Sequence, residues 1–499
     1  MAQTDDMKLR VARTVKWNAI DKIASMALYT LTGIVLARVV PKEDFGLVGA
    51  VAVFQAFAAL FVDSGFSSAL VQRKKVSRLD YSSVLWFNLC VAGIIYMLLF
   101  IAAPLIADCY QGDVRLIPLS RVMFLTFILN ASAIVQTNRL MKRMEVKMIT
   151  IANALGLAIS SVVAIWMALD GYGAWALVWQ AIVNAGVKSA VLWFASGWLP
   201  LMRVSWTSLR SFFKVGSGMM GGAFLNILFR NIYAFLIGNR AGMIPLSYYS
   251  QADKWSNMGI SSLSAMLTQS FLPALSDYQD NPERFASSTA KMNRFTSYLL
   301  FPCVGIVVAS ATALFHLLFG TKWDASIILF QLLMVRGIFT VLSSVYNNYI
   351  LALGRAKMIV GTELMRDIAA LVAIALTWSY IAIERPDNPV YGITVLLWGQ
   401  IAASFLTWGA TLVIAARLSL RPWWQFITDS LPYAGVTLVA VIVMAGLPSV
   451  IHSPVLLLAA QISSGAAVYL IINSLLGSVI QREALGFIFS RFCRSGKVK

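Results

Sequence analysis

Long apolar runs separated by short polar connections form the pattern of this chain. One run, in residues 45–75, is apolar for about seventeen residues, continues as Asp63-Ser64-Gly65-Phe66 and ends on Arg73-Lys74-Lys75. A run of this length crosses a bilayer as a helix, because hydrocarbon offers no partners to backbone polar groups. The same pattern predicts about fourteen membrane spans, near residues 15–40, 46–71, 81–107, 116–137, 148–169, 174–196, 211–238, 246–272, 295–319, 324–351, 358–383, 390–416, 431–450 and 454–477.

Composition agrees with this pattern and narrows the class of protein. The chain has 499 residues, of which 59% are hydrophobic and 12% charged, and its mean hydropathy is +0.75. Soluble domains carry about 25% charged residues. The apolar runs are too long and too uniform for the alternating strands of an outer-membrane barrel. We therefore predict an all-α polytopic membrane protein.

The basic residues lie between the spans, where they set orientation. Alternate connections hold 27 Lys and Arg on one side and 6 on the other, with 7 inside spans. Cytoplasmic connections carry the excess of Lys and Arg, so both termini are predicted to be cytosolic and the number of spans even. The net charge of +18 is thus explained by topology, and no nucleic-acid partner is predicted.

A short internal repeat suggests how the spans are grouped. Residues 138–149 resemble residues 348–359 at an offset of 210, where the fourth span of each half meets the fifth. Internal repeats are common in secondary transporters. We predict two six-helix lobes related by a pseudo-two-fold axis, 1–205 and 206–420, followed by a C-terminal helix pair and basic tail, 421–499.

Motifs for soluble chemistry are missing from the sequence. The four cysteines show no paired or metal-binding spacing, and there is no P-loop, HExxH or GxSxG motif. Gly216-Ser217-Gly218-Met219-Met220-Gly221 fits GxGxxG, but it opens an apolar span, so we read it as a hinge or close-packing surface. We predict no catalytic residue, no cofactor and no metal site.

Polar residues recur at helical spacing inside four spans. The stripes are Asn18, Lys22, Ser25, Tyr29 and Thr32 on the first span; Asn226 and Arg230 on the seventh; Ser250, Lys254, Asn257, Ser261, Ser264 and Thr268 on the eighth; and Arg336, Thr340, Ser343 and Asn347 on the tenth. Small polar residues alone mark seams between helices. A cation on each stripe indicates more, because an unpaired one costs about 2.5–3.5 kcal/mol in hydrocarbon.

We therefore predict a hydrated, cationic cavity between the two bundles that binds an anion. Lys22, Lys254 and Arg336 are the principal candidates, and Arg121 and Arg230 lie nearer the outer end. Asp63 and Asp253 are candidates for gating or ion coupling, although each could instead pair with a local Lys or lie at a helix seam. Glu363 and Arg366 are three residues apart on one span and are predicted to pair with each other.

Several segments resemble those of a known family. They are the run at 45–75, Asp80-Tyr81-Ser82, Ala103-Pro104-Leu105-Ile106-Ala107, Asn231-Ile232-Tyr233, residues 248–253 and Gly320-Thr321-Lys322-Trp323. Over nearly its whole length the chain is similar to the Wzx-type, polysaccharide-transporter branch of the multidrug/oligosaccharidyl-lipid/polysaccharide exporter superfamily. The resemblance implies two six-helix lobes around a central cavity, with extra C-terminal helices.

The resemblance also implies a function in the bacterial inner membrane. It points to a flippase that moves undecaprenyl-pyrophosphate-linked oligosaccharides for lipopolysaccharide, capsule or exopolysaccharide assembly. Its partners would be this substrate, membrane lipids, and the polymerase and glycosyltransferases of the pathway. Two alternatives are a multidrug exporter of organic cations, which needs an acidic cavity, and a membrane polymerase or glycosyltransferase, which needs a larger outer loop. No sugar-binding residue carries over from the family.

Overall fold

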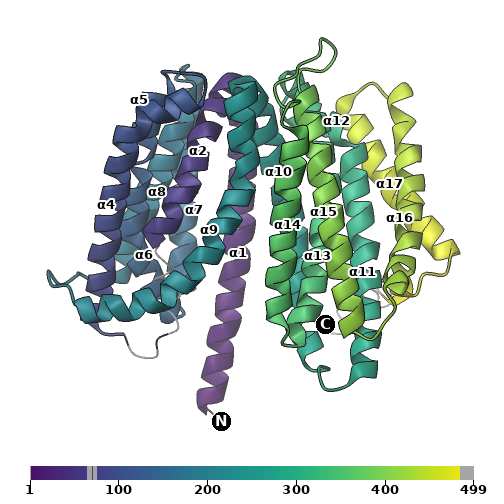
Figure 1. Ribbon diagram of the computed structural model, residues 1–499, viewed down its shortest axis with the longest axis horizontal. Helices are drawn as coiled ribbons and strands as arrows, with labels where there is room; N and C mark the ends of the chain where they lie inside the picture. Colours follow the sequence, from purple (N-terminus) through teal and green to yellow (C-terminus); the bar gives the residue numbers. More distant parts are fainter. Residues whose placement is uncertain (1, 64–69, 71–72, 74–75, 484–499) are drawn as a thin grey trace, which may run out of the picture. The chain divides into compact units, whose positions relative to one another are not determined.

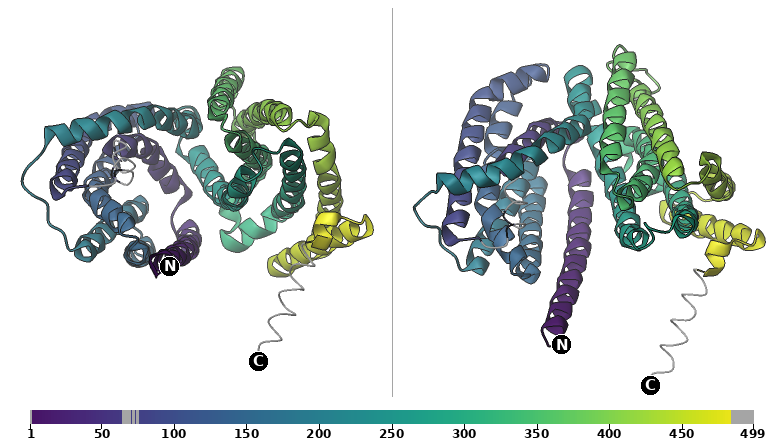
Figure 2. Two further views of the ribbon diagram at one scale, coloured as in Figure 1. Left: turned by 90° about the horizontal axis from the view of Figure 1, so that it is seen from below. Right: turned by 60° about the horizontal axis from the view of Figure 1, so that its bottom comes forward.

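The structure is a computed structural model that describes residues 2–63, 70, 73 and 76–483, and these are helical almost throughout (Figures 1 and 2). The chain divides into two compact units, Met1–Ser250 and Gln251–Lys499, with the boundary inside one helix. The N-terminal unit contains α1 (Ala2–Val39), α2 (Lys42–Asp63), α4 (Arg78–Cys109), α5 (Leu116–Met123), α6 (Thr126–Lys142), α7 (Val146–Leu169), α8 (Ala174–Ser196), α9 (Trp206–Ala241) and the start of α10 (Met243–Ser276). The C-terminal unit continues α10 and adds α11 (Pro282–Ala309), α12 (Ala311–Leu318), η1 (Thr321–Trp323), α13 (Asp324–Ala352), α14 (Ala356–Thr377), α15 (Tyr391–Leu418), α16 (Trp423–Ala445), η2 (Leu447–Ser449) and α17 (Pro454–Leu475).

The predicted polytopic helical fold is confirmed. Within the described residues, twelve helical segments are long and apolar enough to cross a membrane. The other two of the fourteen predicted spans correspond to α10 and α14, with 34 and 22 residues. Both are long enough to cross, but charged and hydroxyl side chains lower their hydropathy. Both helices carry charged residues within the predicted spans, Asp253 and Lys254 on α10 and Glu363, Arg366 and Asp367 on α14.

The internal repeat extends to backbone conformation. α6 ends at residue 142 and α13 at 352, and α7 begins at 146 and α14 at 356, so both pairs differ by 210. In the two turns, Met144 and Gly354 have φ of 59° and 69°. The Met144 N–H donates to Met141 O at 3.0 Å, and the Gly354 N–H donates to Leu351 O at 2.9 Å. Met144 thus adopts a left-handed conformation that glycine adopts more easily in the second copy.

The predicted fourth span, 116–137, is two helices rather than one. α5 ends at Met123 and α6 begins at Thr126, so the helix is interrupted inside the apolar segment. The Thr126 hydroxyl donates to Met123 O at 2.7 Å and accepts a hydrogen bond from Gln55 Nε2 of α2 at 2.8 Å. Irregular backbone is tolerated at membrane depth only where protein groups or water satisfy it. At the interruption the hydroxyl of Thr126, a residue that is 1% exposed, satisfies the backbone carbonyl of Met123, and Gln55 holds that hydroxyl in place.

The last two helices pack against α11 in the C-terminal unit. Asp429 of α16 accepts hydrogen bonds from Arg294 Nε at 2.7 Å and from Arg421 Nη2 at 2.9 Å. The Tyr469 hydroxyl of α17 donates to Tyr298 O of α11 at 2.8 Å. These contacts join α16 and α17 to the C-terminal unit through polar bonds as well as apolar packing. The predicted boundaries at 205/206 and 420/421 stay predictions.

Candidate functional site

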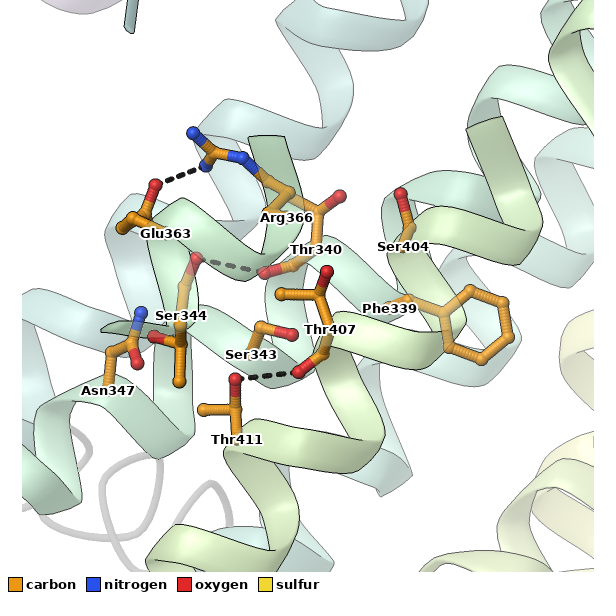
Figure 3. Close-up of a pocket in the computed structure, with 11 residues that line it drawn as sticks. Phe339, Thr340, Ser343, Ser344, Asn347, Glu363, Arg366, Ser404, Thr407 and Thr411 are labelled. Carbon is orange, nitrogen blue, oxygen red and sulfur yellow. Dashed lines mark hydrogen bonds and ion pairs between the residues drawn. The ribbon is translucent and has the colours of Figure 1, made fainter. Parts of the chain in front are cut away.

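A polar groove lies in the C-terminal unit between α13, α14 and α15 (Figure 3). It encloses about 60 Å³, enough for a small group of water molecules. All of its lining side chains except one are polar; the lining comprises Phe339, Thr340, Ser343, Ser344 and Asn347 of α13, Thr362, Glu363 and Arg366 of α14, and Ser404, Thr407 and Thr411 of α15. We call it the α13–α15 groove.

Two polar stripes form opposite walls of the α13–α15 groove. The predicted stripe on α13 consists of residues 336, 340, 343 and 347, and α15 carries a second stripe at 400, 404, 407 and 411. Each α15 residue follows its α13 counterpart by 64 positions, and the first pair, Arg336 and Gln400, is hydrogen-bonded. Residues at steps of three and four share one helix face. The two stripes therefore run side by side in the same direction.

Arg336 lies one turn before the groove and has an unusual environment for a cation. It is 12 residues into α13, or about 18 Å from the helix start at 1.5 Å per residue. Its Nη1–H donates to Gln400 Oε1 at 3.0 Å, and its Nε is buried without a hydrogen-bond partner. Among the described residues no carboxylate forms an ion pair with it. A guanidinium held by a neutral amide retains donors for an anionic or strongly polar ligand.

Arg366 is in the opposite situation, because two carboxylates surround it. Its Nη1 is 2.5 Å from Glu363 Oε2, and its Nη2 is 3.0 Å from Asp367 Oδ1. The predicted Glu363–Arg366 pair is thus confirmed, and Asp367 is an additional partner. The charges of Arg336, Arg366, Glu363 and Asp367 sum to zero. The groove as a whole is neutral, and positive charge is available only locally, at Arg336.

Hydroxyl and amide groups give the α13–α15 groove its chemistry. The Ser344 and Thr411 hydroxyls donate to Thr340 O and Thr407 O, one turn earlier, at 2.9 and 2.8 Å, and both keep acceptor capacity (Figure 3). Asn347 Oδ1 is buried with no partner. A set of groups that can both donate and accept suits a ligand rich in hydroxyl groups. The site therefore favours a sugar or a hydrated polar group over an apolar ligand.

The other candidate cations do not line this groove. Lys254 on α10 is half-buried, with its Nζ 5.2 Å from the ring centroid of Trp255. Lys22 on α1 is exposed, whereas its neighbour Asp21 accepts a hydrogen bond from Asn153 of α7 at 3.2 Å. The structure therefore groups only Arg336 with the groove. The convergence of these lysines on one cavity between the lobes stays a prediction.

The two outer arginines belong to the N-terminal unit. Arg121 of α5 donates from Nε to Phe100 O at 3.2 Å, with its guanidinium 4.4 Å from the Phe100 ring centroid. Arg230 on α9 is exposed. Of the two gating candidates, Asp253 is half-buried on α10, and the Asp63 side chain lies outside the described residues. Their proposed roles stay predictions.

The remaining stripe residues are divided between polar surface and helix contacts. On the first and eighth spans, Asn18 and Ser261 are exposed, whereas Ser25, Ser250 and Asn257 are half-buried. None of these five lines the α13–α15 groove. On the tenth span, Thr340 and Asn347 do line it. The tenth-span stripe thus lies at a polar hollow, and the binding roles predicted for all of these residues stay predictions.

Sequence reasoning missed the α15 wall of the groove. Gln400, Ser404, Thr407 and Thr411 are spaced by four, three and four residues, the same signal that identified the α13 stripe. That stripe carries no charge, so the criterion of an intramembrane cation does not select it. The constant offset of 64 between the stripes becomes meaningful only when α13 and α15 are known to pack together.

Comparison with known proteins places the chain in a family. The sequence profile of the family described as "Polysaccharide biosynthesis protein" matches residues 35–328, which is more than half of the chain. The chain belongs to this family. Its membership confirms the predicted resemblance to the polysaccharide-transporter branch of the exporter superfamily.

Two curated relatives match most of the length of the chain. It is 26% identical over 366 residues to the succinoglycan biosynthesis transport protein ExoT of Rhizobium meliloti (strain 1021), covering 73% of this chain and 74% of ExoT. It is 24% identical over 352 residues to the lipopolysaccharide biosynthesis protein WzxC of Escherichia coli (strain K12), covering 69% and 70%. Both relatives support the same branch.

Solved structures show the same fold at low sequence identity. The lipid II flippase MurJ, in an inward closed conformation, matches with a TM-score of 0.71 and 12% identity over 93% of this chain and 98% of MurJ. An inward-facing multidrug resistance MATE family transporter matches with a TM-score of 0.58 and 14% identity, over 80% and 98%. At this level of identity the likeness establishes the fold alone. The chain is a multi-pass membrane protein of that fold.

Proposed function

We propose that this protein is a flippase that moves undecaprenyl-pyrophosphate-linked oligosaccharide repeat units across the bacterial inner membrane. The units would serve lipopolysaccharide, capsule or exopolysaccharide assembly. In this mechanism the polar head enters a cavity from the inner leaflet while the polyprenyl chain stays in lipid. The two lobes then alternate between inward and outward access. Both termini are cytosolic in this orientation, as the distribution of basic residues predicts.

The observation that carries the proposal is the environment of Arg336. A guanidinium about 18 Å inside a membrane helix costs free energy unless a ligand or partner uses it. Its one partner among the described residues is the neutral amide of Gln400. A pyrophosphate would supply the missing negative charge, and guanidinium groups bind phosphate oxygens through two parallel hydrogen bonds. Lys22, Lys254, Arg121 and Arg230 remain further candidates for the same headgroup.

The α13–α15 groove would contact the sugar. Its hydroxyl and amide groups match the donor and acceptor capacity of sugar hydroxyls, and its balanced charge allows a neutral glycan to bind. The location of the groove next to Arg336 agrees with a ligand that carries sugar and phosphate together. Asp253 and Asp63 are proposed gating or ion-coupling residues.

The two alternative functions have less support. An exporter of organic cations needs an unpaired carboxylate in its site, whereas Glu363 and Asp367 are both paired with Arg366. A polymerase or glycosyltransferase needs room for a catalytic loop. Within the described part of the chain, the connection at 378–390 is the longest between two helices, and it is too short for a catalytic domain. The family relatives named as transport proteins favour transport over catalysis.

A vesicle assay tests the proposal directly. The full-length protein is reconstituted into liposomes that contain a fluorescent undecaprenyl-pyrophosphate-linked oligosaccharide, and a membrane-impermeant oxidant reports which leaflet holds the sugar. We expect the protein to increase the rate of leaflet exchange over protein-free liposomes. Absence of exchange, together with uptake of a fluorescent organic cation by the same vesicles, would favour the cation exporter. Cleavage or extension of the glycan would favour an enzyme.

A further inference from the structure

α9 is too long to be a simple membrane span. Its 36 residues measure about 54 Å at 1.5 Å per residue, whereas the hydrocarbon core is about 30 Å thick. In Figures 1 and 2 its first half runs across the end of the N-terminal unit, and its second half runs along the other helices. The first turns, Trp206 to Phe213, therefore lie at the edge of the unit. This is the end at which the basic connections gather, which is predicted to face the cytosol.

An apolar hollow lies between these first turns of α9 and the neighbouring helix α4. It encloses about 340 Å³ and is lined by Phe87, Trp206, Leu209, Arg210 and Phe213. Ligand pockets have volumes of about 300–1,000 Å³. Trp206 is 74% exposed and Phe213 is 51% exposed, so two large aromatic side chains leave the hollow open to its surroundings. The lining is apolar except for the guanidinium of Arg210.

The charge around the hollow is positive. Arg73, Arg78, Arg203 and Arg210 are all exposed at this end of the unit. Arg73 lies with its guanidinium 4.9 Å from the ring centroid of Phe212, next to the hollow. The carboxylate nearest in these elements, Asp80, is 8% exposed and accepts a hydrogen bond from Ser208 Oγ at 2.6 Å. The acidic group is therefore withdrawn into the protein. Arg78 donates to Leu199 O and Arg73 to Ser211 Oγ, whereas Arg210 is exposed and lines the hollow itself.

We propose that this hollow binds an anionic phospholipid of the cytosolic leaflet. An acyl chain would occupy the apolar hollow between Phe87, Leu209 and Phe213, and the headgroup phosphate would lie at Arg210. Trp206, Leu209, Arg210 and Phe213 recur at steps of three and four, so the apolar side chains and the guanidinium share one face of α9. Interfacial helices bind membranes by combining buried apolar area with attraction of basic residues to anionic lipids. Charge complementarity selects an anionic headgroup over a zwitterionic one. This inference does not depend on the transport substrate.

Native mass spectrometry of the purified, delipidated full-length protein tests it. Phosphatidylglycerol and phosphatidylcholine with identical acyl chains are titrated separately. We expect the first phosphatidylglycerol to bind about fivefold more tightly than phosphatidylcholine, the factor expected for one basic residue near an anionic lipid. Arg210→Gln should remove this preference. Trp206→Ala combined with Phe213→Ala should weaken both lipids, because the hollow loses two of its walls.

Control measurements separate a specific site from general attraction. Arg284→Gln removes an exposed arginine from the first turn of α11 in the other unit and should leave the preference intact. An equal loss in Arg284→Gln and Arg210→Gln would overturn the proposal, as would equal affinity for the two lipids in the unmodified protein. Displacement of phosphatidylglycerol by undecaprenyl pyrophosphate at equal concentration would assign the hollow to the carrier lipid and overturn the phospholipid as its occupant.

Discussion

Replacing Arg336 with methionine separates a binding role from a structural one. Methionine keeps most of the length of the side chain but removes the charge and the hydrogen bond to Gln400, which is 3.0 Å long. Gln400 is 5% exposed, so its amide oxygen would be left buried without that partner. The variant thus removes one cation from the membrane and leaves one polar group unsatisfied.

The two effects on stability oppose each other and are similar in size. An unsatisfied buried acceptor costs about 1–3 kcal/mol. Removing an arginine from the centre of a membrane helix is favourable by about 2.5–3.5 kcal/mol. The free energy of unfolding of Arg336→Met should therefore stay within about 1 kcal/mol of the unmodified protein, or rise. Gln400→Leu should lower it, because the cation then loses its partner.

Transport should respond quite differently from stability. A hydrogen bond to a charged group contributes about 1.5–3 kcal/mol, which corresponds to a factor of roughly ten to 150. We expect Arg336→Met to reduce leaflet exchange of the lipid-linked oligosaccharide by that factor, with a melting curve in detergent like that of the unmodified protein. Arg355→Met, which changes an exposed arginine in the turn after α13, is the matched control and should transport normally. A lower melting temperature with normal exchange per folded molecule would refute the reasoning.

Three further predictions concern stability and use thermal unfolding as the measurement. Gly337→Ala places a methyl group 2.3 Å from Ile260 Cδ1 and should lower the free energy of unfolding by about 1–3 kcal/mol. Adding Ile260→Ala in a double variant should relieve this clash and recover the lost stability. A double variant with no recovery would contradict the contact. Asp429→Ala leaves the Arg421 guanidinium, which is 11% exposed, without its carboxylate and should lower the free energy of unfolding by about 3–5 kcal/mol. Glu483→Gln breaks the exposed pair with Lys291 and should lower it by less than about 1 kcal/mol. Equal losses in the two variants would count against burial as the cause. Hydrogen bonds from Arg115 hold the pKa of Asp113 below its ordinary value. The stability that this carboxylate contributes is therefore present above the unfolded pKa of about 3.9 and disappears as pH falls through the folded pKa. Asp113→Asn should lower the melting temperature at neutral pH but not in strong acid.

The sequence alone was sufficient for properties that depend on each segment separately. Transfer of apolar side chains into lipid is nearly independent of the neighbouring helices, so hydropathy located the membrane spans and their approximate number. Pairing within one helix depends only on spacing, so Glu363 and Arg366 could be paired in advance. The repeat at an offset of 210 was visible because both copies keep the same turn between helices.

Only the tertiary structure decided which polar faces meet. A stripe on one helix specifies a direction around that helix, but the packing of its neighbours determines whether the direction leads to lipid, to another helix or to a hollow. Arg336 and Gln400 are 64 residues apart, and nothing local to either predicts their hydrogen bond. At the break between α5 and α6, the Thr126 hydroxyl likewise accepts a hydrogen bond from Gln55, a residue of another helix. Contacts of this kind form between separate segments, and for that reason they follow from the packed fold rather than from the order of residues.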